Sequence, residues 1–478
     1  MTKEKVYKKV IADNLENVLA SGFIPELGEH KAGKVRDVHF KGDNLIMVAS
    51  DRVSAFDHVL PTYIPFKGMI LNLFNQWAMK NSTDIIPNAS LPSPDPNVII
   101  QRNLKNTGIE CVVRGYVWGS LAGDYEKGTR TKCGIRFPAG MLQYQKLEAP
   151  IFTPTTKAEK GHDEDVDFEF LKSKLGEEIA VKVRDASIAL FNRGVELAER
   201  AKMLFIDTKY EFGTDEAGNL FLIDEANTPD SSRFCDAGEY ATKFSAISAA
   251  MKGWEGTTVS DLLKGRPDLK IREESKQYVR DVLIAGGYKE GQSIPALTPE
   301  QVIETAWRYI ESYERLTGKR FDFSIAEIPA KKRIMMNLVK AGLAYGGCVV
   351  PMGASEKDGP HWEKLEKALK EAKVPYTQPF YKSAHKNPEE VISFVRMMDQ
   401  SIEPIVYISF AGRSNGHGPI VCGVTQNPVI ANPVFSDTAA YMVDIHSSLR
   451  MPSGMPLMTI VDPGNAALAA KRIIDLAR

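Results

Sequence analysis

The segment between residues 207 and 230 carries acidic side chains at a spacing that could hold a divalent cation. Gly218-Asn219 marks a hairpin turn between two strand-like runs. With residues 216–219 as the loop, Glu211 falls opposite Asp224 on the partner strand. Two carboxylates facing each other across a hairpin repel, and a Mg²⁺ ion between them would remove that cost. The alternative is an exposed acidic hairpin, which the pattern by itself favours.

Two short basic patterns could meet the phosphates of a nucleotide. Lys209 lies on the same face of its strand as Glu211, because side chains two residues apart in a strand point the same way. In Gly33-Lys34-Val35-Arg36-Asp37, Lys34 and Arg36 share a face in the same manner, and the glycine lets a backbone approach a phosphate. Taken alone, this second pattern more commonly marks a solvated basic strand face.

Four loop segments in the last third of the chain combine small residues with basic ones. A small residue near a helix start offers backbone N–H groups to a phosphate. His385 stands just ahead of Pro388, which begins a helix, and a histidine there could act as a general acid or base near neutral pH. A single loop histidine more often has no such role, so both interpretations stay open. The segments are Gly353-Ala354-Ser355, Ser383-Ala384-His385-Lys386, Ala411-Gly412-Arg413-Ser414-Asn415-Gly416 and Ser447-Ser448-Leu449-Arg450-Met451-Pro452-Ser453-Gly454.

The elements that must position these residues fall into two groups along the chain. In the first group, apolar runs predict strands at 45–49, 111–113 and 203–206, and helical periodicity predicts helices at 181–202 and 299–316. The second helix has a capping-box start, with Thr298 as the cap, Pro299 in the first turn and Gln301 completing the box.

The pattern breaks between residues 317 and 333, where we expect a domain boundary. After it, short apolar strands at 349–352, 405–410 and 457–461 alternate with helices at 362–372, 388–398 and 466–477. Such alternation predicts βαβ units and a parallel sheet, whose ligands bind beyond the carboxyl ends of the strands. We therefore divide the chain into a first domain, 1–325, a linker, 326–345, and a second domain, 346–478.

Composition narrows the possible partners. With 43% hydrophobic and 25% charged residues and a formal net charge of -1, the chain has no electrostatic preference for nucleic acid or anionic membranes. No segment has the length and apolarity of a signal peptide or a membrane span. The five cysteines are widely spaced and form no CxxC, which argues against a disulfide framework and a structural zinc site. We expect a cytoplasmic protein without nucleic-acid or membrane partners.

Seven motifs in order, over about residues 10–320, resemble the SAICAR synthetase family. They are Gly33-Lys34-Val35-Arg36-Asp37, Ser50-Asp51-Arg52-Val53-Ser54-Ala55-Phe56-Asp57, Ile64-Pro65-Phe66-Lys67-Gly68, Val113-Arg114-Gly115-Tyr116-Val117-Trp118-Gly119-Ser120, Pro154-Thr155-Thr156-Lys157-Ala158-Glu159, Asp207-Thr208-Lys209-Tyr210-Glu211-Phe212-Gly213, and Asp224-Glu225 followed by Thr228-Pro229-Asp230-Ser231-Ser232-Arg233. The resemblance implies an ATP-binding α+β domain that joins L-aspartate to the carboxylate of carboxyaminoimidazole ribonucleotide (CAIR).

The resemblance also implies roles for particular residues. It places ATP at Gly33, Lys34, Arg36, Lys67 and Lys209, with Lys209 also catalytic, and Mg²⁺ at Glu211 and Asp224. It places the nucleotide substrate at Arg114, Ser120, Ser232 and Arg233, with Asp57 and Lys157 as further contacts. Forked guanidinium donors suit carboxylate and phosphate. The structural alternatives are a helix cap for Asp57 and a polar loop around Lys157.

The four loop segments of the second domain, from about residue 348 to 477, resemble aminoimidazole ribonucleotide (AIR) carboxylase. This implies a flavodoxin-like, doubly wound parallel sheet and an octameric homo-oligomer. Lys386 after His385, and Arg413-Ser414-Asn415, resemble the animal-type class, which adds CO₂ directly to AIR. His385 would remove the ring proton, with Lys386 beside it, and the other substrate contacts would be Ser355, Asp358, Ser383, Arg413, Ser414 and Arg450. The basic residues could instead be solvated surface charge.

One loop departs from the family pattern and leaves alternatives open. The family has Met-Gly-Ser-x-Ser-Asp, whereas this chain has Met352-Gly353-Ala354-Ser355-Glu356-Lys357-Asp358-Gly359, one residue longer. The leading hypothesis is a bifunctional enzyme of purine biosynthesis, a ligase and a carboxy-lyase in one chain. The alternatives are a synthetase carrying a catalytically inactive oligomerisation domain, or a C-terminal mutase that uses N5-carboxyaminoimidazole ribonucleotide.

Overall fold

The computed structural model describes residues 2–56, 58–157, 164–252, 257–274, 277–289, 291–412 and 415–478. The chain forms two compact units. The first comprises residues 1–18, 43–45 and 49–326, and the second comprises residues 19–42, 46–48 and 327–478. The second unit therefore combines the C-terminal third of the chain with a segment close to the N-terminus.

The helices of the described chain are α1 Lys3–Ala12, α2 Lys67–Lys80, α3 Gly119–Glu126, α4 Phe168–Leu175, α5 Glu177–Arg200, α6 Ala237–Met251, α7 Val259–Gly265, α8 Gln277–Ala285, α9 Pro299–Thr317, α10 Ala330–Lys340, α11 Gly359–Ala372, α12 Pro388–Met398, α13 His417–Val424, α14 Thr438–Asp444, α15 His446–Leu449 and α16 Pro463–Ala477. Short 3₁₀ helices are η1 Pro25–Leu27, η2 Pro267–Leu269, η3 Phe323–Glu327 and η4 Glu356–Asp358.

The strands are β1 Glu29–Ala32, β2 Arg36–Lys41, β3 Asn44–Ala49, β4 Arg52–Ala55, β5 His58–Tyr63, β6 Ser90–Leu91, β7 Val98–Arg102, β8 Lys105–Asn106, β9 Ile109–Tyr116, β10 Thr131–Lys132, β11 Ile135–Arg136, β12 Lys146–Phe152, β13 Thr155–Thr156, β14 Met203–Thr214, β15 Leu220–Ile223, β16 Ser232–Asp236, β17 Cys348–Gly353, β18 Phe380–Tyr381, β19 Ile405–Phe410, β20 Val429–Ala431 and β21 Leu457–Thr459.

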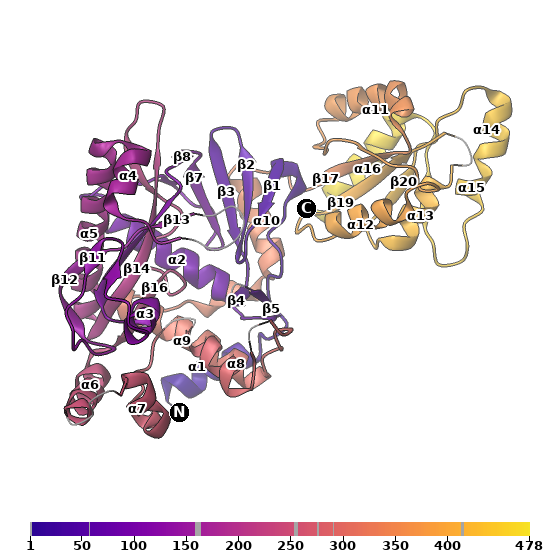
Figure 1. The fold of residues 1–478 in the computed structure, drawn as a ribbon. Helices are drawn as coiled ribbons and strands as arrows, with labels where there is room; N and C mark the ends of the chain where they lie inside the picture. The colour runs from indigo at the N-terminus through magenta and orange to yellow at the C-terminus, as the bar shows by residue number, and fades with distance from the viewer. Residues whose placement is uncertain are drawn as a thin grey trace. The chain divides into compact units, whose positions relative to one another are not determined.

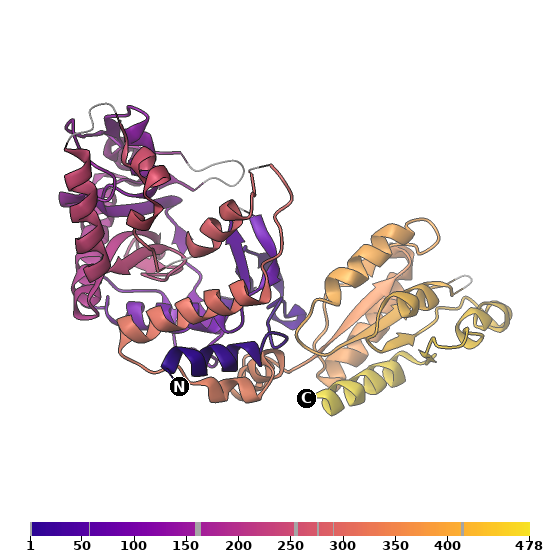
Figure 2. The same cartoon turned by 90° about the horizontal axis from the view of Figure 1, so that it is seen from below.

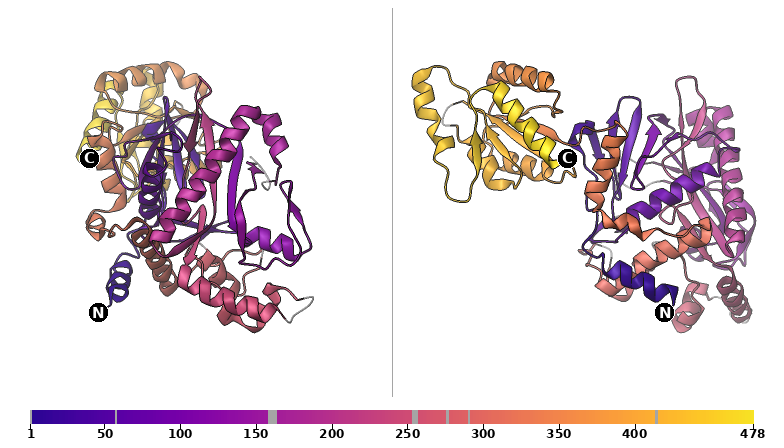
Figure 3. Two further views of the ribbon diagram at one scale, coloured as in Figure 1. Left: turned by 90° about the vertical axis from the view of Figure 1, so that its left-hand side faces the viewer. Right: turned by 180° about the vertical axis from the view of Figure 1, so that it is seen from behind.

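A seven-stranded antiparallel sheet organises the first unit. Its main path is β12-β9-β14-β15, with β13 on β9 and with β8 and β16 on β14. The long helix α5 packs along β14, β9 and β12 (Figure 3). Phe191 of α5 stacks on Phe205 of β14 with ring centroids 5.1 Å apart. Because α5 covers one face of the sheet, the side chains of the opposite face are available for chemistry.

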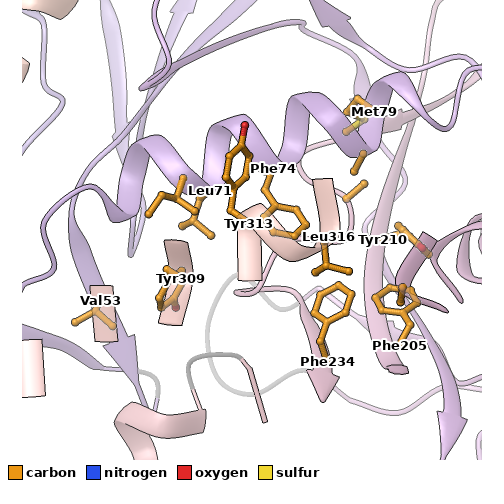
Figure 4. Close-up of a cluster of buried hydrophobic side chains, with 14 of the residues drawn as sticks. Val53, Leu71, Phe74, Met79, Phe205, Tyr210, Phe234, Tyr309, Tyr313 and Leu316 are labelled. Atoms are coloured by element: carbon orange, nitrogen blue, oxygen red, sulfur yellow. The ribbon is translucent and has the colours of Figure 1, made fainter. Parts of the chain in front are cut away.

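The core of the first unit continues from this sheet to the helices α2 and α9. Its buried members include Phe74, Phe205, Phe234, Tyr313 and Leu316 (Figure 4). Helix α9 also packs against α1, as Figure 2 shows. These contacts follow from the strong apolar stripe of α9, which the sequence periodicity predicted.

The capping box predicted for α9 is present. The Thr298 side chain accepts a hydrogen bond from the Gln301 backbone N–H at 3.4 Å, and the Gln301 side chain accepts from the Thr298 N–H at 2.9 Å. The strands and helices predicted in both halves of the chain are likewise confirmed as β3, β9, β14, α5, β17, α11, α12, β19, β21 and α16.

The second unit contains a five-stranded parallel sheet in the order β18-β17-β19-β20-β21. Numbered by sequence, this is 2-1-3-4-5, the strand order of flavodoxin-like sheets. Side chains of β17 alternate between two cores, with Val349 packing among α11 and α16 and Val350 among α12 and α13. Figure 1 shows α11 and α12 on opposite sides of β17 and β19. The predicted doubly wound fold is confirmed.

A pair of glutamates, the half-buried Glu26 and the buried Glu403, joins the early segment of the second unit to its sheet. The Glu26 carboxylate accepts hydrogen bonds from the backbone N–H groups of residues 345, 346 and 347 at 2.7 to 3.4 Å. The Glu26 N–H donates to Glu403 Oε1 at 2.7 Å, and the Cys348 thiol donates to the same oxygen at 3.4 Å. Burial first, and then the charge of Glu26, raise the pKa of Glu403 well above its usual range.

In the part of the chain that the structure describes, no helix combines the length and apolarity needed to cross a bilayer.

Candidate active sites

The open face of the seven-stranded sheet carries a carboxylate flanked by two arginines. In the register of the sheet, Asp207 of β14 lies opposite Arg114 of β9 on one side and Arg233 of β16 on the other. Arg233 Nη1 donates to Asp207 Oδ2 at 2.6 Å, and Arg114 Nη1 donates to the same oxygen at 3.5 Å. The antiparallel pairing itself therefore builds the cluster from three residues that are distant in sequence.

The remaining donors of Arg114 are held by hydroxyl groups. Its Nε donates to Thr153 Oγ1 at 3.0 Å and its Nη2 donates to Ser120 Oγ at 3.3 Å. Burial lowers the pKa of Arg114, against the opposing charge of Asp207. Ser232, one position from Arg233, shares a hydrogen bond of 2.7 Å with Thr208. The structure thus brings together three of the residues predicted to bind substrate: Arg114, Ser120 and Arg233. Ser232 pairs with Thr208, which alternates with Asp207 along β14, so its side chain points to the opposite face of the sheet.

Arg233 has a second acidic partner that the sequence analysis missed. Its Nε lies 3.3 Å from Glu273 Oε2, and the indole N–H of Trp118 donates to the other oxygen of Glu273. Gly119, in the left-handed region at φ +55°, lies against the guanidinium, where an added Cβ would come within 2.8 Å of Arg233 Nη1. No short motif surrounds Glu273, and only the fold brings it to Arg233.

Further along β14, two lysines surround the predicted metal ligand Glu211. Lys157 forms an ion pair with Glu211 Oε2, Lys209 Nζ lies 3.6 Å from Oε1, and Asn106 donates to Oε2 at 3.0 Å. Lys209 also pairs with Glu110 of β9. Burial would raise the pKa of Glu211, but Lys157 and Lys209 outweigh it and the net pKa is lowered. Glu211 is therefore a carboxylate in this structure.

The predicted register of the 207–230 hairpin is wrong by one residue. Glu211 pairs with Ile223, not with Asp224, and Thr214 pairs with Leu220. The loop is longer than predicted because Asp215 leaves the ladder: its side chain accepts from the Asn219 N–H at 2.8 Å and caps the turn.

Asp224 consequently lies just past the end of β15, in the left-handed region at φ +58°. Burial would lower the pKa of Lys209, but the charges of Glu110, Glu211 and Asp224 raise it. Both predicted metal ligands therefore act on the same ammonium group. Among the described residues, no three acidic, histidine or cysteine side chains gather as a metal site. Two carboxylates completed by substrate phosphates remain a standard arrangement for Mg²⁺.

Lys67, predicted to contact ATP, is fully buried. Its Nζ donates to Asp230 Oδ2 at 2.8 Å and lies 5.4 Å from the ring centre of Tyr309. The Tyr309 hydroxyl donates to Asp230 Oδ1 at 2.6 Å. Both contacts fix Asp230, three residues ahead of Arg233, so Lys67 supports the segment that carries the substrate-binding residues.

Gly33, Lys34 and Arg36 belong to the second unit, where they connect β1 to β2. The Gly33 N–H donates to the Arg36 carbonyl at 2.8 Å, and a Cβ on Gly33 would lie 2.8 Å from that oxygen. The strand begins only at Arg36, so the predicted strand across this motif is wrong for Lys34, which lies in the turn and is exposed. Arg36 is buried.

In the parallel sheet, His385 lies in an exposed turn after β18. Backbone N–H groups of Lys386 and Asn387 donate to the Ser383 carbonyl at 3.2 and 2.8 Å and close the turn ahead of α12. A second, buried histidine lies behind it. His417 Nδ1 lies 2.9 Å from Ser409 Oγ and Nε2 lies 3.1 Å from the Lys382 carbonyl. Burial lowers the pKa of His417 to about 4.

The remaining loop segments of the second unit are held by hydrogen bonds between their own side chains and backbone. Ser355 and Asp358 form a capping box, in which the Ser355 N–H donates to Asp358 Oδ2 at 2.9 Å. Asn415 donates to Ser448 Oγ at 2.7 Å and so links the loop after β19 to the 447–454 segment. That segment begins inside the helix α15 and is a loop only from Arg450 onward, and Arg450 is exposed.

Several predicted positions lie outside the described residues. These are Asp57, Arg413, Ser414 and residues 158–163. The structure also contains residues near the predicted sites that the sequence analysis missed. His361 Nε2 lies 2.6 Å from Asn432 Oδ1 beyond β20, and Glu110 and Asp207 hold the predicted basic residues. For the two acidic residues, opposite charges on adjacent strands were the available signal, but only a known register makes it usable.

Comparisons with known proteins divide the chain in the same order. A family model described as SAICAR synthetase matches residues 29–249, and one described as AIR carboxylase matches residues 348–478. A phosphoribosylaminoimidazole-succinocarboxamide synthase of Cytophaga hutchinsonii is 41% identical over 313 residues, covering 65% of this chain and 94% of its own length.

Two further relatives extend this likeness. A chloroplastic phosphoribosylaminoimidazole-succinocarboxamide synthase of Arabidopsis thaliana is 39% identical over 346 residues, covering 69% of this chain and 78% of the relative. A solved structure of SAICAR synthase from Saccharomyces cerevisiae, complexed with SAICAR, superposes with a TM-score of 0.53 at 26% identity. It covers 64% of this chain and 99% of that one.

Proposed function

We propose, for a chain that belongs to the SAICAR synthetase family and continues into an AIR carboxylase domain, that it catalyses two successive reactions of purine biosynthesis. The carboxylase domain converts AIR to CAIR. The synthetase domain then joins CAIR to L-aspartate with ATP and releases SAICAR, ADP and phosphate. The chain is thus both a ligase and a carboxy-lyase.

The observation that carries the synthetase assignment is the row of charged side chains on one face of β14. Asp207, Lys209 and Glu211 alternate along the strand and so project from the same face of the sheet. The arginines at one end suit the carboxylate and phosphate of an anionic nucleotide. The lysines at the other end suit the phosphates of ATP. A carboxylate at the boundary between them could receive a phosphoryl group.

The chemistry requires little covalent participation by the protein. A carboxylate is a poor acyl donor, so ATP phosphorylates it before the aspartate amine displaces phosphate. Positioning and charge neutralisation supply most of the rate enhancement in such transfers. In this proposal Arg114, Ser120 and Arg233 hold the nucleotide, while Lys209 stabilises charge on the transferred phosphoryl group.

Two carboxylates fit a magnesium ion. Glu211 is ionised and surrounded by ammonium groups, and Asp224 acts on the same Lys209. A divalent cation would take over the neutralising role that Lys157, whose side chain is 43% exposed, now fulfils. With Glu211 and Asp224 as its protein ligands, it would supply positive charge beside the phosphates of ATP. Lys157 would then be released toward the substrates.

Gly33, Lys34, Arg36 and Lys67 complete the proposed ATP site, and Asp57 and Lys157 the proposed substrate contacts. For Lys67 the buried pair with Asp230 favours support of the substrate segment over direct contact with ATP. We further propose domain limits of 1–325 and 346–478 with a linker between them, a cytoplasmic location and assembly as an octamer.

In the carboxylase domain we assign proton removal to His385. Both known reaction types of this family pass through a ring carbon that bears a proton and a carboxylate together, and a base must remove that proton. His385 is exposed at the carboxyl edge of the parallel sheet, where ligands bind. Ser355, Asp358, Ser383, Arg413, Ser414 and Arg450 are the proposed substrate contacts, and Lys386 and Arg413 favour the class that uses CO₂.

Carboxylation of AIR without ATP tests this assignment. The intact chain and His385→Asn are each supplied with AIR, excess bicarbonate and carbonic anhydrase, and CAIR is measured. We expect CAIR from the intact chain and none from the variant. Conversion of supplied CAIR, aspartate and ATP to SAICAR should be the same in both, which shows that the variant is folded.

Two other outcomes would overturn the bifunctional assignment as stated. CAIR formed only from the N-carboxylated nucleotide would identify the second domain as a mutase. No CAIR from either nucleotide, with SAICAR synthesis intact, would identify it as a catalytically inactive domain with a structural role.

A further inference from the structure

A half-buried glutamate outside the sequence motifs contacts one of the two substrate-binding arginines. Glu273 lies between β16 and the Trp118-Gly119 segment, with its two oxygens facing different donors. One oxygen is 3.3 Å from Arg233 Nε, and the other accepts from the Trp118 indole N–H. The Trp118 side chain is itself almost fully buried, so it anchors the carboxylate firmly.

Arg233 is thereby held at two separate edges. Asp207 accepts from Nη1 at 2.6 Å, Glu273 faces Nε, and Gly119 lies close to the guanidinium. A planar group held at two edges and closely approached by a third residue has one orientation. Among the described residues Nη2 of Arg233 donates to no protein group, so both of its N–H groups are left for a ligand.

We propose that Glu273 is a positioning residue that fixes the plane of the Arg233 guanidinium for the anionic imidazole nucleotide. The inference rests on the proposed function, in which Arg233 binds that nucleotide. Glu273 touches no substrate and acts only through Arg233.

The balance of charges in the arginine cluster supports a positioning role for Glu273, because Asp207 by itself cannot hold both arginines. Asp207 is shared between Arg114 and Arg233, so one negative charge faces two positive ones. Without Glu273, both guanidinium groups would compete for the single carboxylate. Arg233, with about a quarter of its side chain exposed, has more freedom to turn than Arg114. Glu273 supplies the second acceptor and prevents that rotation.

The adjacent Glu274 provides a matched control. Its side chain is 3% exposed, against 10% for Glu273, and it pairs with Arg272 at 2.7 Å instead of with Arg233. Glu274→Gln therefore removes the same charge at the neighbouring position in sequence and leaves the arginine cluster intact.

The experiment measures steady-state SAICAR synthesis by the full chain and by Glu273→Gln and Glu274→Gln. In Glu273→Gln the amide can accept from Trp118 only by turning its NH₂ group toward the Nε–H of Arg233. We expect the KM for CAIR to rise roughly tenfold or more, as for the loss of one charge-assisted hydrogen bond. The KM for ATP and kcat at saturating CAIR should stay within about twofold. Glu274→Gln should keep the KM for CAIR of the parent chain.

A pH profile separates positioning from a merely structural effect. Burial raises the pKa of Glu273, while Arg233 and the Trp118 N–H oppose the shift and the charges of Asp207 and Asp281 add to it. Tyr144 and Cys235 also face this carboxyl. As pH falls, Glu273 takes up a proton and its hold on Arg233 weakens, so the KM for CAIR should rise on the acid side. Glu273→Gln should show that high KM throughout and lose this acid rise.

Trp118→Phe provides a second test in case Glu273→Gln fails to fold. It removes the anchoring N–H, keeps the buried ring, and should raise the KM for CAIR by less than Glu273→Gln does. An unchanged KM in Glu273→Gln, or an equal rise in Glu274→Gln, would overturn the inference. If the unaltered chain makes no SAICAR from CAIR, aspartate and ATP, the proposed function fails first and the inference with it.

Discussion

Replacing Asp207 by asparagine should destabilise the first unit and expose how far the arginine cluster depends on one carboxylate. Asp207 is buried and its Oδ2 lies 2.6 Å from Arg233 Nη1 and 3.5 Å from Arg114 Nη1. At an effective dielectric constant of about 20, these distances correspond to gross attractions of about 6 and about 5 kcal/mol. Desolvation of the three groups offsets most of that sum.

The net loss in the free energy of unfolding depends on which arginine charge loses its carboxylate partner in the variant. Arg233 keeps Glu273, whereas the hydrogen bonds that Arg114 retains among the described residues are to the hydroxyl groups of Thr153 and Ser120. Removing one member of a buried pair typically costs about 3–5 kcal/mol because an uncompensated charge remains. For a unit of this size we expect Tm to fall by roughly 6–10 °C, at about 2 °C per kcal/mol.

The assay is thermal unfolding followed by tryptophan fluorescence. Trp77, Trp118, Trp254 and Trp307 fall in the residue range of the first unit and Trp362 in that of the second, so the signal reports mainly on the first. The double variant with Arg114→Met removes both charges and should recover part of the lost stability, which makes the two changes non-additive. A Tm for Asp207→Asn within about 1 °C of the parent, or strict additivity in the double variant, would refute the reasoning.

Three further predictions follow from single contacts. Glu403 is buried beside Glu26, and both effects raise its pKa in the folded state. The protonated Glu403 therefore contributes its full stabilisation below the pKa of the unfolded chain. That stabilisation is lost as pH rises through the pKa of the folded chain. Glu403→Gln should therefore remove part of the fall in Tm as pH rises above the ordinary range of a glutamate carboxyl. The same dependence of Tm on pH in the variant and the parent, measured by circular dichroism, would contradict this. Gly119→Ala should raise the KM for CAIR in the SAICAR assay, because the new Cβ would displace Arg233; an unchanged KM would show that the guanidinium has room to move. Thr298→Ala should cost about 1 kcal/mol by loss of the α9 cap, measured by urea unfolding, whereas Thr298→Ser should cost little.

Local signals in the sequence were sufficient for the elements but not for their pairing. The cap of α9 could be predicted from Thr298, Pro299 and Gln301. The alternation of short strands with helices after residue 348 was enough to predict a parallel sheet. The hairpin register was wrong because it depended on Asp215, whose side chain can either continue the ladder or cap a longer turn. A shift of one residue placed Ile223 opposite Glu211 and moved Asp224 past the strand end.

Contacts between distant segments were beyond such reasoning. Asp207 could be assigned to a motif, but its two arginine partners follow from the registers of β9 and β16. Glu273 carries no pattern, because its role is defined by a tryptophan 155 residues away. Lys67 illustrates the converse: its motif was recognised, but only its burial and its pair with Asp230 reveal what the ammonium group contacts.

The composition of the second unit has a consequence for synthesis of the chain. Glu26 obtains its hydrogen-bond donors from Tyr345 and the residues after it, 319 positions later. At a translation rate of about 5–20 residues per second, the early segment waits on the order of half a minute before its partners leave the ribosome. During that interval the strands β1 and β2 are made but their unit is incomplete. The early segment of the second unit is therefore open to misassembly until Tyr345 and the residues after it are available to bind Glu26.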